Sequence, residues 1–290
     1  MKAARFEYHA PTSVDEAVQL LASFGDDAKV LGGGQSLVPM LGLRLTRFAH
    51  LVDLNKIPEL SYIETGDGVL SIGAMTRQAS AEHSSDVATS APLLAKAIPH
   101  IGHFQIRNRG TIGGSIAHAD PASELPTVAR VLDAEIEVAG VAGTRRIPAD
   151  EFFVSMWETA LENAEIVVAI HVPVAESRSG FGFEELALRP GDFALAGAAV
   201  SLVLDDEGAI RHVRIGLLGM DATPVRAREA ESSLLGKVRG AIELQEIGRL
   251  AVSAAKPTGD VHASANYRIT VGAVLVERAL VAALEEAARG

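Results

Sequence analysis

The most informative stretch of this sequence is VLGGGQSLVPML, which spans residues 30–41. Three consecutive glycines follow a short apolar run, and the polar pair Gln35 and Ser36 comes directly after them. A glycine run after a strand lets successive backbone N–H groups point inward, and such a concavity binds anions, most often phosphate. The stretch therefore favours an anion-binding loop, with a tight loop that holds no ligand as the alternative.

Familiar nucleotide-binding and nucleophile motifs do not match this stretch. The pattern G-x-x-x-x-G-K-[ST] is absent, and G-x-G-x-x-G would require glycine where Leu37 stands. The G-x-S-x-G motif of nucleophilic serine hydrolases is absent too. The sequence therefore supports neither a P-loop nor a standard Rossmann site.

A small unit of parallel strands is predicted around the glycines. The segment 12–27 has helical periodicity, and Ser13 and Glu16 within it fit an S-x-x-E capping box. AKVL, directly before the glycines, and HLVDL at 50–54 have the composition of short buried strands. Because strands alternate with helix and loop, residues 1–56 are predicted to form a small parallel α/β unit.

A larger mixed α+β unit is predicted over residues 57–176. The segment 60–76 alternates around a glycine-flanked turn, which is typical of a hairpin, and short helices should follow it. Residues 125–140 indicate a helix and then a strand, and AGTRRIP at 142–148 is interpreted as a turn. AEIVVAIHVP at 164–173 indicates a strand that ends at a proline.

A separate C-terminal domain is predicted to begin where Ser, Arg and Gly loosen the chain at 177–180. Residues 193–220 suggest two or three strands with a turn at DDEG, and the chain from about 226 onward has helical periodicity. The expected fold class is therefore α+β. A two-part domain at 1–176 should precede a domain of small antiparallel sheet and helical bundle at 177–290.

Charge and cysteine content exclude several functions. The net charge is −11 and no basic block occurs, so a nucleic-acid partner is not expected. The chain has no cysteine, which excludes disulfides, thiol nucleophiles and iron–sulfur ligation by this chain. No apolar secretion signal opens the sequence, and its longest apolar run, 194–204, is too short to span a bilayer. We therefore expect a cytoplasmic protein without an integral membrane segment.

A second glycine-rich stretch, RNRGTIGGSIAHADPASELP at 107–126, strengthens the ligand interpretation. Glycines surround Thr111, Ser115 follows them, and a helix is predicted to start directly after DPAS. Two loops of small residues in one chain can face each other across a long, anionic, ring-bearing ligand. A dinucleotide fits that description.

Together, GGGQSLVPMLGLRL at 32–45 and the stretch 107–126 resemble the FAD-binding medium subunits of the molybdenum hydroxylases, a family that includes carbon monoxide and xanthine dehydrogenases. The resemblance extends to LRPGDFALAGAAV at 188–200 and covers essentially the whole chain. It implies an oxidoreductase subunit with bound FAD, an iron–sulfur small subunit and a molybdopterin large subunit as partners, and a heterotrimer that dimerises. Electrons would pass from 2Fe–2S clusters through FAD to an external acceptor.

The resemblance also implies specific cofactor contacts. The first loop would wrap the FAD pyrophosphate with its backbone N–H groups, and Glu124 would bond a sugar or ribityl hydroxyl. Leu195 stands about where xanthine dehydrogenases have a lysine, which changes the electrostatics near the flavin. No catalytic side chain is implied, because flavin itself carries the redox chemistry. The implied cofactor-binding residues are Val30, Leu31, Gly32, Gly33, Gly34, Gln35, Ser36, Leu37, Ile101, Thr111, Gly113, Gly114, Ser115, His118, Glu124, Val167 and Phe193.

Two other functions are open on the sequence alone. One is a stand-alone FAD-dependent reductase similar to the enolpyruvyl-glucosamine reductases, which have a comparable glycine loop but also an NAGAYG-like segment that is missing here. The other is a non-catalytic scaffold module with vestigial loops. Turnover by the chain alone would indicate the first, and assembly without any cofactor would indicate the second.

No metal site is expected, because His100 and His103 lack a third ligand and no H-E-x-x-H pattern occurs. His118 and Asp120 resemble an acid–base pair, but we expect His118 to lie at the cofactor and Asp120 to open a turn before a proline. Trp157, the only tryptophan, is interpreted as core or subunit contact. Arg107 and Arg109 are interpreted either as solvated or as contacts to a partner or phosphate.

Overall fold

The computed structural model describes residues 2–290. Its N-terminal unit is a parallel sheet of order β1-β3-β2 with two helices. The strand β1 precedes the two that the sequence indicated. These elements are β1 (Glu7–His9), α1 (Val14–Phe24), β2 (Ala28–Leu31), α2 (Leu37–Leu43) and β3 (His50–Asp53).

The start of α1 shows a shifted form of the predicted capping box. The Ser13 hydroxyl accepts a hydrogen bond from the Glu16 N–H at 3.2 Å, as expected. The Glu16 carboxylate, however, accepts from the N–H of Thr12 at 2.8 Å rather than from that of Ser13. Gly25, at φ +53°, ends the helix. Both ends of α1 are thus encoded locally.

The central sheet has the order β4-β5-β10-β6-β7, and all its pairs are antiparallel. The hairpin β4-β5 turns at Asp67 and Gly68, both at positive φ, which is the twist that tight hairpins favour. The five strands are β4 (Ile63–Gly66), β5 (Val69–Gly73), β6 (Glu135–Gly140), β7 (Gly143–Pro148) and β10 (Ile166–Pro173).

The interpretation of 142–148 as a turn is wrong, because Gly143–Pro148 forms the strand β7 along the whole length of β6. Ile147 is the only buried residue of this strand, and Thr144, Arg145 and Arg146 are exposed. An edge strand of this kind lacks the apolar alternation that identifies strands in a sequence.

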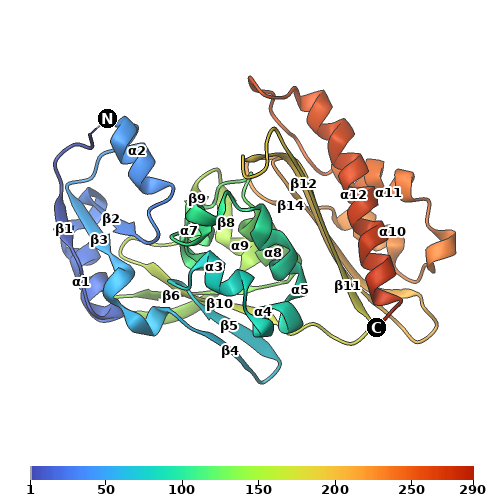
Figure 1. Cartoon of the computed structure of the whole chain (residues 1–290), viewed down its shortest axis with the longest axis horizontal. Helices are drawn as coiled ribbons and strands as arrows, with labels where there is room; N and C mark the ends of the chain where they lie inside the picture. Colours follow the sequence, from blue (N-terminus) through green and yellow to red (C-terminus); the bar gives the residue numbers. More distant parts are fainter. Residues whose placement is uncertain (1) are drawn as a thin grey trace.

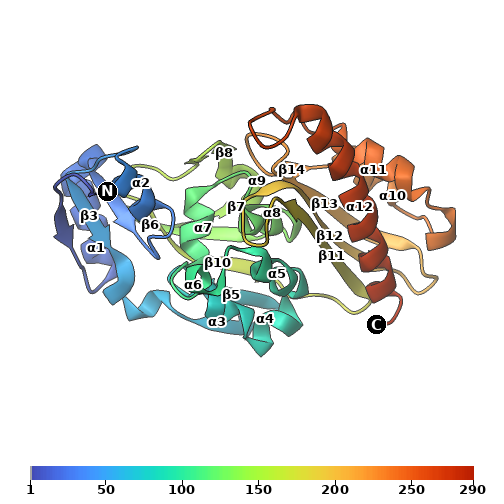
Figure 2. The ribbon, with the colours of Figure 1, turned by 45° about the horizontal axis from the view of Figure 1, so that its top comes forward.

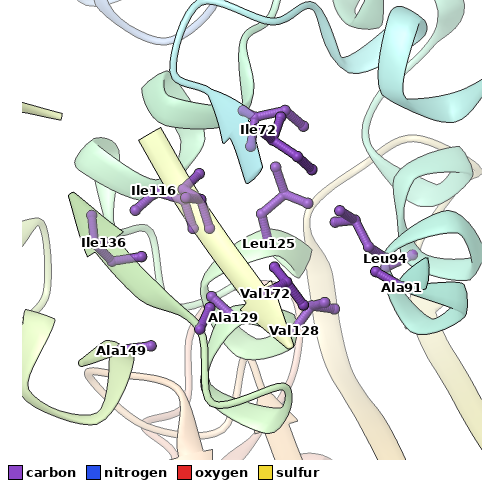
Figure 3. Close-up of a cluster of buried hydrophobic side chains, with 14 of the residues drawn as sticks. Ile72, Ala91, Leu94, Ile116, Leu125, Val128, Ala129, Ile136, Ala149 and Val172 are labelled. Atoms are coloured by element: carbon purple, nitrogen blue, oxygen red, sulfur yellow. The ribbon is translucent and has the colours of Figure 1, made fainter. Parts of the chain in front are cut away.

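Short helices cover one face of the central sheet and enclose the main core with it (Figures 1 and 2). Ile72 and Val172 from the sheet meet Ile116 and Leu125 from the helices, as Figure 3 shows. The helices are α3 (Gln78–Glu82), α4 (Ser85–Ser90), α5 (Pro92–Ala97), α6 (Phe104–Arg107), α7 (Ile112–His118), α8 (Glu124–Val131) and α9 (Ala149–Phe152), followed by a small hairpin of β8 (Phe153–Ser155) and β9 (Glu158–Thr159).

The C-terminal part is an antiparallel sheet of order β11-β12-β13-β14 covered by helices. A Cβ at Gly182 would lie 2.8 Å from the Cα of Ala279, so the glycines of β11 allow the long helix α12 to rest directly on the sheet. The elements are β11 (Ser179–Ala187), β12 (Ala194–Leu204), β13 (Ile210–Leu218), β14 (Val225–Arg226), α10 (Arg228–Leu234), α11 (Leu244–Val252) and α12 (Ala265–Ala287).

The three parts lie in a row, with the N-terminal sheet at one end, the central sheet in the middle and α12 at the other end (Figure 1). Ala17 and Val52 of the N-terminal unit share a small core with Ile166 and Val168 of β10, so the first two parts are packed together. The α+β fold class is confirmed, while the domain limit after residue 176 stays a prediction. Among residues 2–290, no helix combines the length and apolarity needed to cross a membrane.

Candidate functional site

The first glycine stretch links the carboxyl end of β2 to α2 and exposes a row of unused donors. Gly34 takes a positive φ of +74°, a conformation that favours glycine. Within residues 2–290, no acceptor receives a hydrogen bond from the N–H groups of Gly33, Gly34, Gln35 or Ser36. Four neighbouring unpaired amides at the end of a parallel strand have the chemistry of a phosphate cradle.

The two glycine-rich stretches lie directly against each other. A Cβ at Gly33 would overlap the carbonyl oxygen of Arg109 and lie 2.8 Å from the Cα of Gly110. A Cβ at Gly32 would lie 3.2 Å from the Oγ1 of Thr111. Glycine is therefore required at 33 for this close approach. The structure brings together the two stretches that the sequence singled out.

A side-chain network outside the motifs holds the two stretches in place. The Asn55 amide donates to the carbonyl oxygen of Gly32 at 3.0 Å, and Arg77 donates to the Asn55 side-chain oxygen at 2.6 Å. Arg77 also donates to the carbonyl oxygen of Arg109 at 2.6 Å. Asn55 is itself oriented by Asp53, whose carboxylate accepts from the Asn55 N–H at 2.9 Å. Sequence reasoning missed Asn55 and Arg77, for which only the position of Asn55 just after a strand was a signal.

In the second stretch, most backbone N–H groups already donate hydrogen bonds to other residues of the chain. The Thr111 hydroxyl accepts from the N–H of Gly114 at 3.1 Å and so caps α7. The N–H of Gly113 donates to the carbonyl oxygen of Ala74 at 2.9 Å, and a Cβ at Gly113 would lie 2.7 Å from the Cα of Ala74. Gly113 thus serves close packing on β5, whereas Gly114 is exposed and Ser115 is half-buried.

His118, at the end of α7, forms a small group with Asp120 and Trp157. The rings of His118 and Trp157 stack at 6.5 Å with an interplanar angle of 12°. The Trp157 indole donates to the Asp120 carboxylate at 3.2 Å, and the same carboxylate accepts from the N–H of Ala122 at 2.9 Å. Asp120 therefore opens the predicted turn. Of the two interpretations of Trp157, core or subunit contact, the first is wrong because the residue is 59% exposed, and the second stays a prediction.

The protonation of His118 is shaped by its surroundings. Burial lowers the pKa of His118, and the negative charge of Asp120 opposes this only in part. The imidazole Nε2 lies 3.8 Å from the Asp120 carboxylate, beyond hydrogen-bonding distance. The shift favours a neutral imidazole, and this ring, stacked on the indole, can contact a ligand ring.

Two buried carboxyl groups, those of Glu124 and Glu185, lie close to each other. Glu124 is the first residue of α8, and burial raises its pKa to about 7. Burial and the nearby charge of Glu124 raise the pKa of Glu185, on β11, to about 8. One Glu185 oxygen has no hydrogen-bond partner among the described residues and lies 4.0 Å from the Nδ1 of His100. Sequence reasoning identified Glu124 but missed Glu185, which is buried by elements distant in the sequence.

Three further predicted residues are Ile101, Val167 and Phe193. Ile101 packs against the central core, and a Cβ at Gly191 would lie 2.9 Å from the carbonyl of Gly102, so the 189–193 segment rests beside Ile101. Phe193, in that segment, is 66% exposed. Val167 contributes its side chain to the central core. Its neighbour Val168 accepts a hydrogen bond from Ala74, the residue that also holds Gly113.

Arg107 has a structural role. Its guanidinium donates to the Glu82 carboxylate at 2.7 and 3.0 Å and to the carbonyl oxygen of Ile101 at 3.1 Å. Of the two interpretations that the sequence left open, solvated residue or contact to a partner or phosphate, neither describes this arrangement. Arg107 instead fixes the loop that follows α5.

A cavity of about 480 Å³ lies elsewhere, between the β6-β7 hairpin and β13, and includes none of the residues of the two glycine stretches. Its arginines are neutralised within the chain: Arg226 pairs with Glu231 at 2.8 Å, and Arg228 pairs with Asp150. This cavity is therefore interpreted as a polar gap between packed elements and not as a ligand site.

Known proteins share this arrangement. Residues 4–175 match the family described as FAD binding domain in molybdopterin dehydrogenase, and residues 181–283 match the CO dehydrogenase flavoprotein C-terminal domain. The chain therefore belongs to the family of FAD-binding medium subunits of molybdenum hydroxylases. FAD is its cofactor, and it is an oxidoreductase subunit.

Individual relatives cover nearly the whole chain. The 6-hydroxypseudooxynicotine dehydrogenase complex subunit alpha of Paenarthrobacter nicotinovorans is 42% identical, over 99% of this chain and 97% of its own. The carbon monoxide dehydrogenase medium chain of Hydrogenophaga pseudoflava is 40% identical over 96% and 97%. A solved carbon monoxide dehydrogenase from Hydrogenophaga pseudoflava superposes with a TM-score of 0.96 at 41% identity, with 99% of both chains covered. The family resemblance seen in the sequence is confirmed.

Proposed function

We propose that this chain is the electron-transfer flavin subunit of a molybdenum-dependent dehydrogenase. A small subunit would carry the 2Fe–2S clusters, a large subunit the molybdopterin, and the heterotrimers would pair into a dimer. The absence of cysteine supports this division, because the clusters need thiolate ligands that this chain does not have. The cytoplasmic location stays a prediction.

The observation that carries the proposal is the contact between Gly33 and Arg109, which sets unpaired amides of one stretch beside the second stretch. These amides fit the anionic pyrophosphate of FAD, since they are donors without acceptors at the end of a strand. FAD held by these amides would supply the redox chemistry that links the clusters to an external acceptor. The protein holds the cofactor and limits access to it.

The polar groups of both stretches have proposed tasks. The N–H groups from Gly32 to Ser36 donate to the pyrophosphate, and Thr111 and Ser115 add hydroxyl groups from the second stretch. Glu124 bonds a hydroxyl of the cofactor. Its pKa of about 7 means that it can donate when protonated or accept when ionised.

Further predicted residues enclose the ring system. His118, stacked on Trp157, presents a neutral ring to the cofactor. Ile101 and Phe193 border it from the side of the 189–193 segment, and the backbone of Val167 supports it from β10. Phe193 is a large apolar side chain at an exposed position, as expected of a residue that covers a bound ring.

The domain limits support the same assignment. The first family match ends at residue 175, and the second begins at residue 181. We propose that 1–176 forms the FAD-binding part, with subdomains at about 1–56 and 57–176, and that 177–290 forms the C-terminal domain. The segment 189–193 then reaches back from the second domain to border the cofactor beside Gly102.

The test is to purify the complex formed when the chain is co-expressed with its genomic neighbours. The expected preparation contains iron, molybdenum and FAD. Candidate reductants are carbon monoxide, aldehydes and N-heterocycles. With an effective reductant, a complex stripped of FAD should still bleach its clusters but should no longer reduce an external acceptor, and added FAD should restore this step. Equal acceptor reduction with and without FAD would contradict the proposal.

The two alternative functions gain no support from the relatives, whose names are those of dehydrogenase and hydroxylase subunits and chains. A stand-alone reductase would turn over NADPH and a sugar nucleotide without partners. A scaffold would assemble into the complex without FAD. The same purified preparations distinguish both from the proposed function.

A further inference from the structure

The N-terminal sheet carries a group of three metal-binding side chains outside the flavin site. Glu7 and His9 belong to β1, and His50 begins β3. Glu7 is the direct register partner of His50, and His9 lies two residues further along β1, so all three side chains emerge on the same face of the sheet. A metal-ligand atom of each residue lies within 4.8 Å of those of the other two.

The distances within this group are close to those of a tetrahedral zinc site. His9 Nε2 lies 3.1 Å from His50 Nδ1, and the Glu7 carboxylate lies 3.5 Å from His50 Nδ1 and 4.0 Å from His9 Nε2. In a tetrahedral site with Zn–N bonds near 2.0 Å, neighbouring ligand atoms are separated by about 3.3 Å. Small side-chain rotations therefore bring the three atoms to bonding distance of one ion.

Packing fixes the imidazole rings in this orientation. Phe24, at the end of α1, stacks on His50 with ring centroids 3.8 Å apart and an interplanar angle of 8°. Phe24 also contacts His9 at 4.9 Å. The two imidazoles are 22% and 19% exposed, whereas the Glu7 side chain is 73% exposed. The two imidazoles are thus held by packing, whereas the Glu7 carboxylate faces solvent.

We propose that His9 Nε2, His50 Nδ1 and a Glu7 carboxylate oxygen bind one Zn²⁺, with solvent as the fourth ligand. Imidazole and carboxylate are suitable zinc ligands, and a chain without cysteine has no thiolate to compete. No sequence pattern indicated this site, because His9 and His50 are 41 residues apart and meet only through parallel strand pairing.

The position of the site indicates a structural task. His50 opens β3, whereas the first glycine stretch follows the last residue of the neighbouring parallel strand β2. Glu7 and His50 therefore lie at the end of the sheet away from the flavin loop, whereas His9 ends β1 opposite Val52. The ion joins β1, a strand of only three residues, to β3, and so fastens the start of the chain.

The test is to titrate Zn²⁺ into the full chain after removal of metal with a chelator, and to repeat it with Co²⁺, whose visible absorption reports tetrahedral coordination. We expect one Zn²⁺ per chain, tetrahedral Co²⁺ bands that zinc abolishes, and a rise of Tm with zinc. Glu7→Gln, at an exposed position, should weaken binding by about tenfold or more through loss of one ligand.

Two further variants complete the design. His50→Gln should lose the Co²⁺ bands and the zinc-dependent rise of Tm, whereas His212→Gln, at an exposed histidine of β13 outside the group, should behave like the wild type. Each variant is accepted only if its FAD absorbance matches that of the wild type, which shows that it is folded. The proposal is overturned if the wild type binds no zinc, or if Glu7→Gln and His50→Gln both bind it as the wild type does.

Discussion

Gly33 rests against the carbonyl oxygen of Arg109, so closely that a single added methyl group at Gly33 would overlap that oxygen. This contact joins the loop after β2 to the loop before α7, two segments far apart in the sequence. It places the unpaired amides of Gly34 and Ser36 beside the second glycine-rich stretch. The proposed FAD site depends on this approach.

Replacing Gly33 should therefore separate the loops and weaken FAD binding. Gly33→Ala must displace the Arg109 backbone, and overpacking of this kind costs about 1–3 kcal/mol. Titration with FAD, followed by flavin absorbance, measures the loss. Gly42→Ala is the matched control, because Gly42 lies in α2 with open space around its Cβ position. Alanine there should leave FAD binding unchanged and stabilise the helix by about 0.5–1 kcal/mol. Equal FAD affinity in both variants would refute the role of the contact.

The Asn55–Arg77 pair should position the loops without touching the chemistry. Asn55→Ala and Arg77→Ala each break the chain of hydrogen bonds from Gly32 to Arg109, and each should cost about 1 kcal/mol of FAD binding energy. Because the two side chains act through one another, the double variant should cost less than the sum. Isothermal titration of the four proteins gives the coupling. Strict additivity would show that the side chains act independently.

Stability should fall as the pH rises through neutrality. Glu124 and Glu185 have pKa values of about 7 and about 8 in the folded chain, above the value of 4.5 that is usual for a glutamate in water. The folded state therefore binds more protons than the unfolded state in this range, and unfolding becomes easier as the pH rises. For Glu124 alone the effect is roughly 3 kcal/mol, since one pKa unit corresponds to about 1.4 kcal/mol.

Denaturant unfolding of the FAD-free chain at a series of pH values measures this dependence. The loss of stability should begin above pH 4.5, where glutamates of the unfolded chain ionise, and be complete above about pH 8. Glu185→Gln keeps the size of the side chain but cannot ionise, so it should show a smaller loss over the same range. An identical pH dependence in the variant and the wild type would mean that Glu185 is not buried as described.

Trp157 should report FAD binding directly. It is the only tryptophan, and its ring stacks on His118, which we place at the cofactor. Its fluorescence should therefore be quenched when FAD binds, and the quenching should saturate at the affinity found by flavin absorbance. Trp157→Phe removes the signal and should bind FAD nearly as well, because a phenyl ring can still stack on His118. Unchanged tryptophan emission on FAD binding would place the cofactor away from this group.

Much of the fold could be predicted from local signals. The hairpin around Asp67 and Gly68, the helix capped by Ser13 and the strand-then-glycine pattern at Leu31 are encoded within a few residues, and the structure contains all three. The two glycine-rich stretches were recognisable because close backbone approach leaves glycine as the only residue that fits at 33.

Other features depend on tertiary structure and leave no local signal. The strand β7 is an edge strand with exposed side chains and lacks an apolar pattern. Arg77 meets Arg109, and His9 meets His50, only after the chain has folded. Trp157 is hydrophobic yet exposed, because its indole is held by Asp120 and stacks on His118 outside the core. Sequence alone predicts such residues poorly, because their roles depend on tertiary contacts and not on a local sequence pattern.

The most direct test of the central claim is the visible spectrum of the purified chain after incubation with FAD and gel filtration, with the released cofactor identified after acid precipitation. We expect about one FAD per chain in the wild type and a marked loss in Gly33→Ala. A chain that carries no flavin, both alone and in the complex with its genomic neighbours, would contradict the claim that the two glycine-rich stretches form the FAD site.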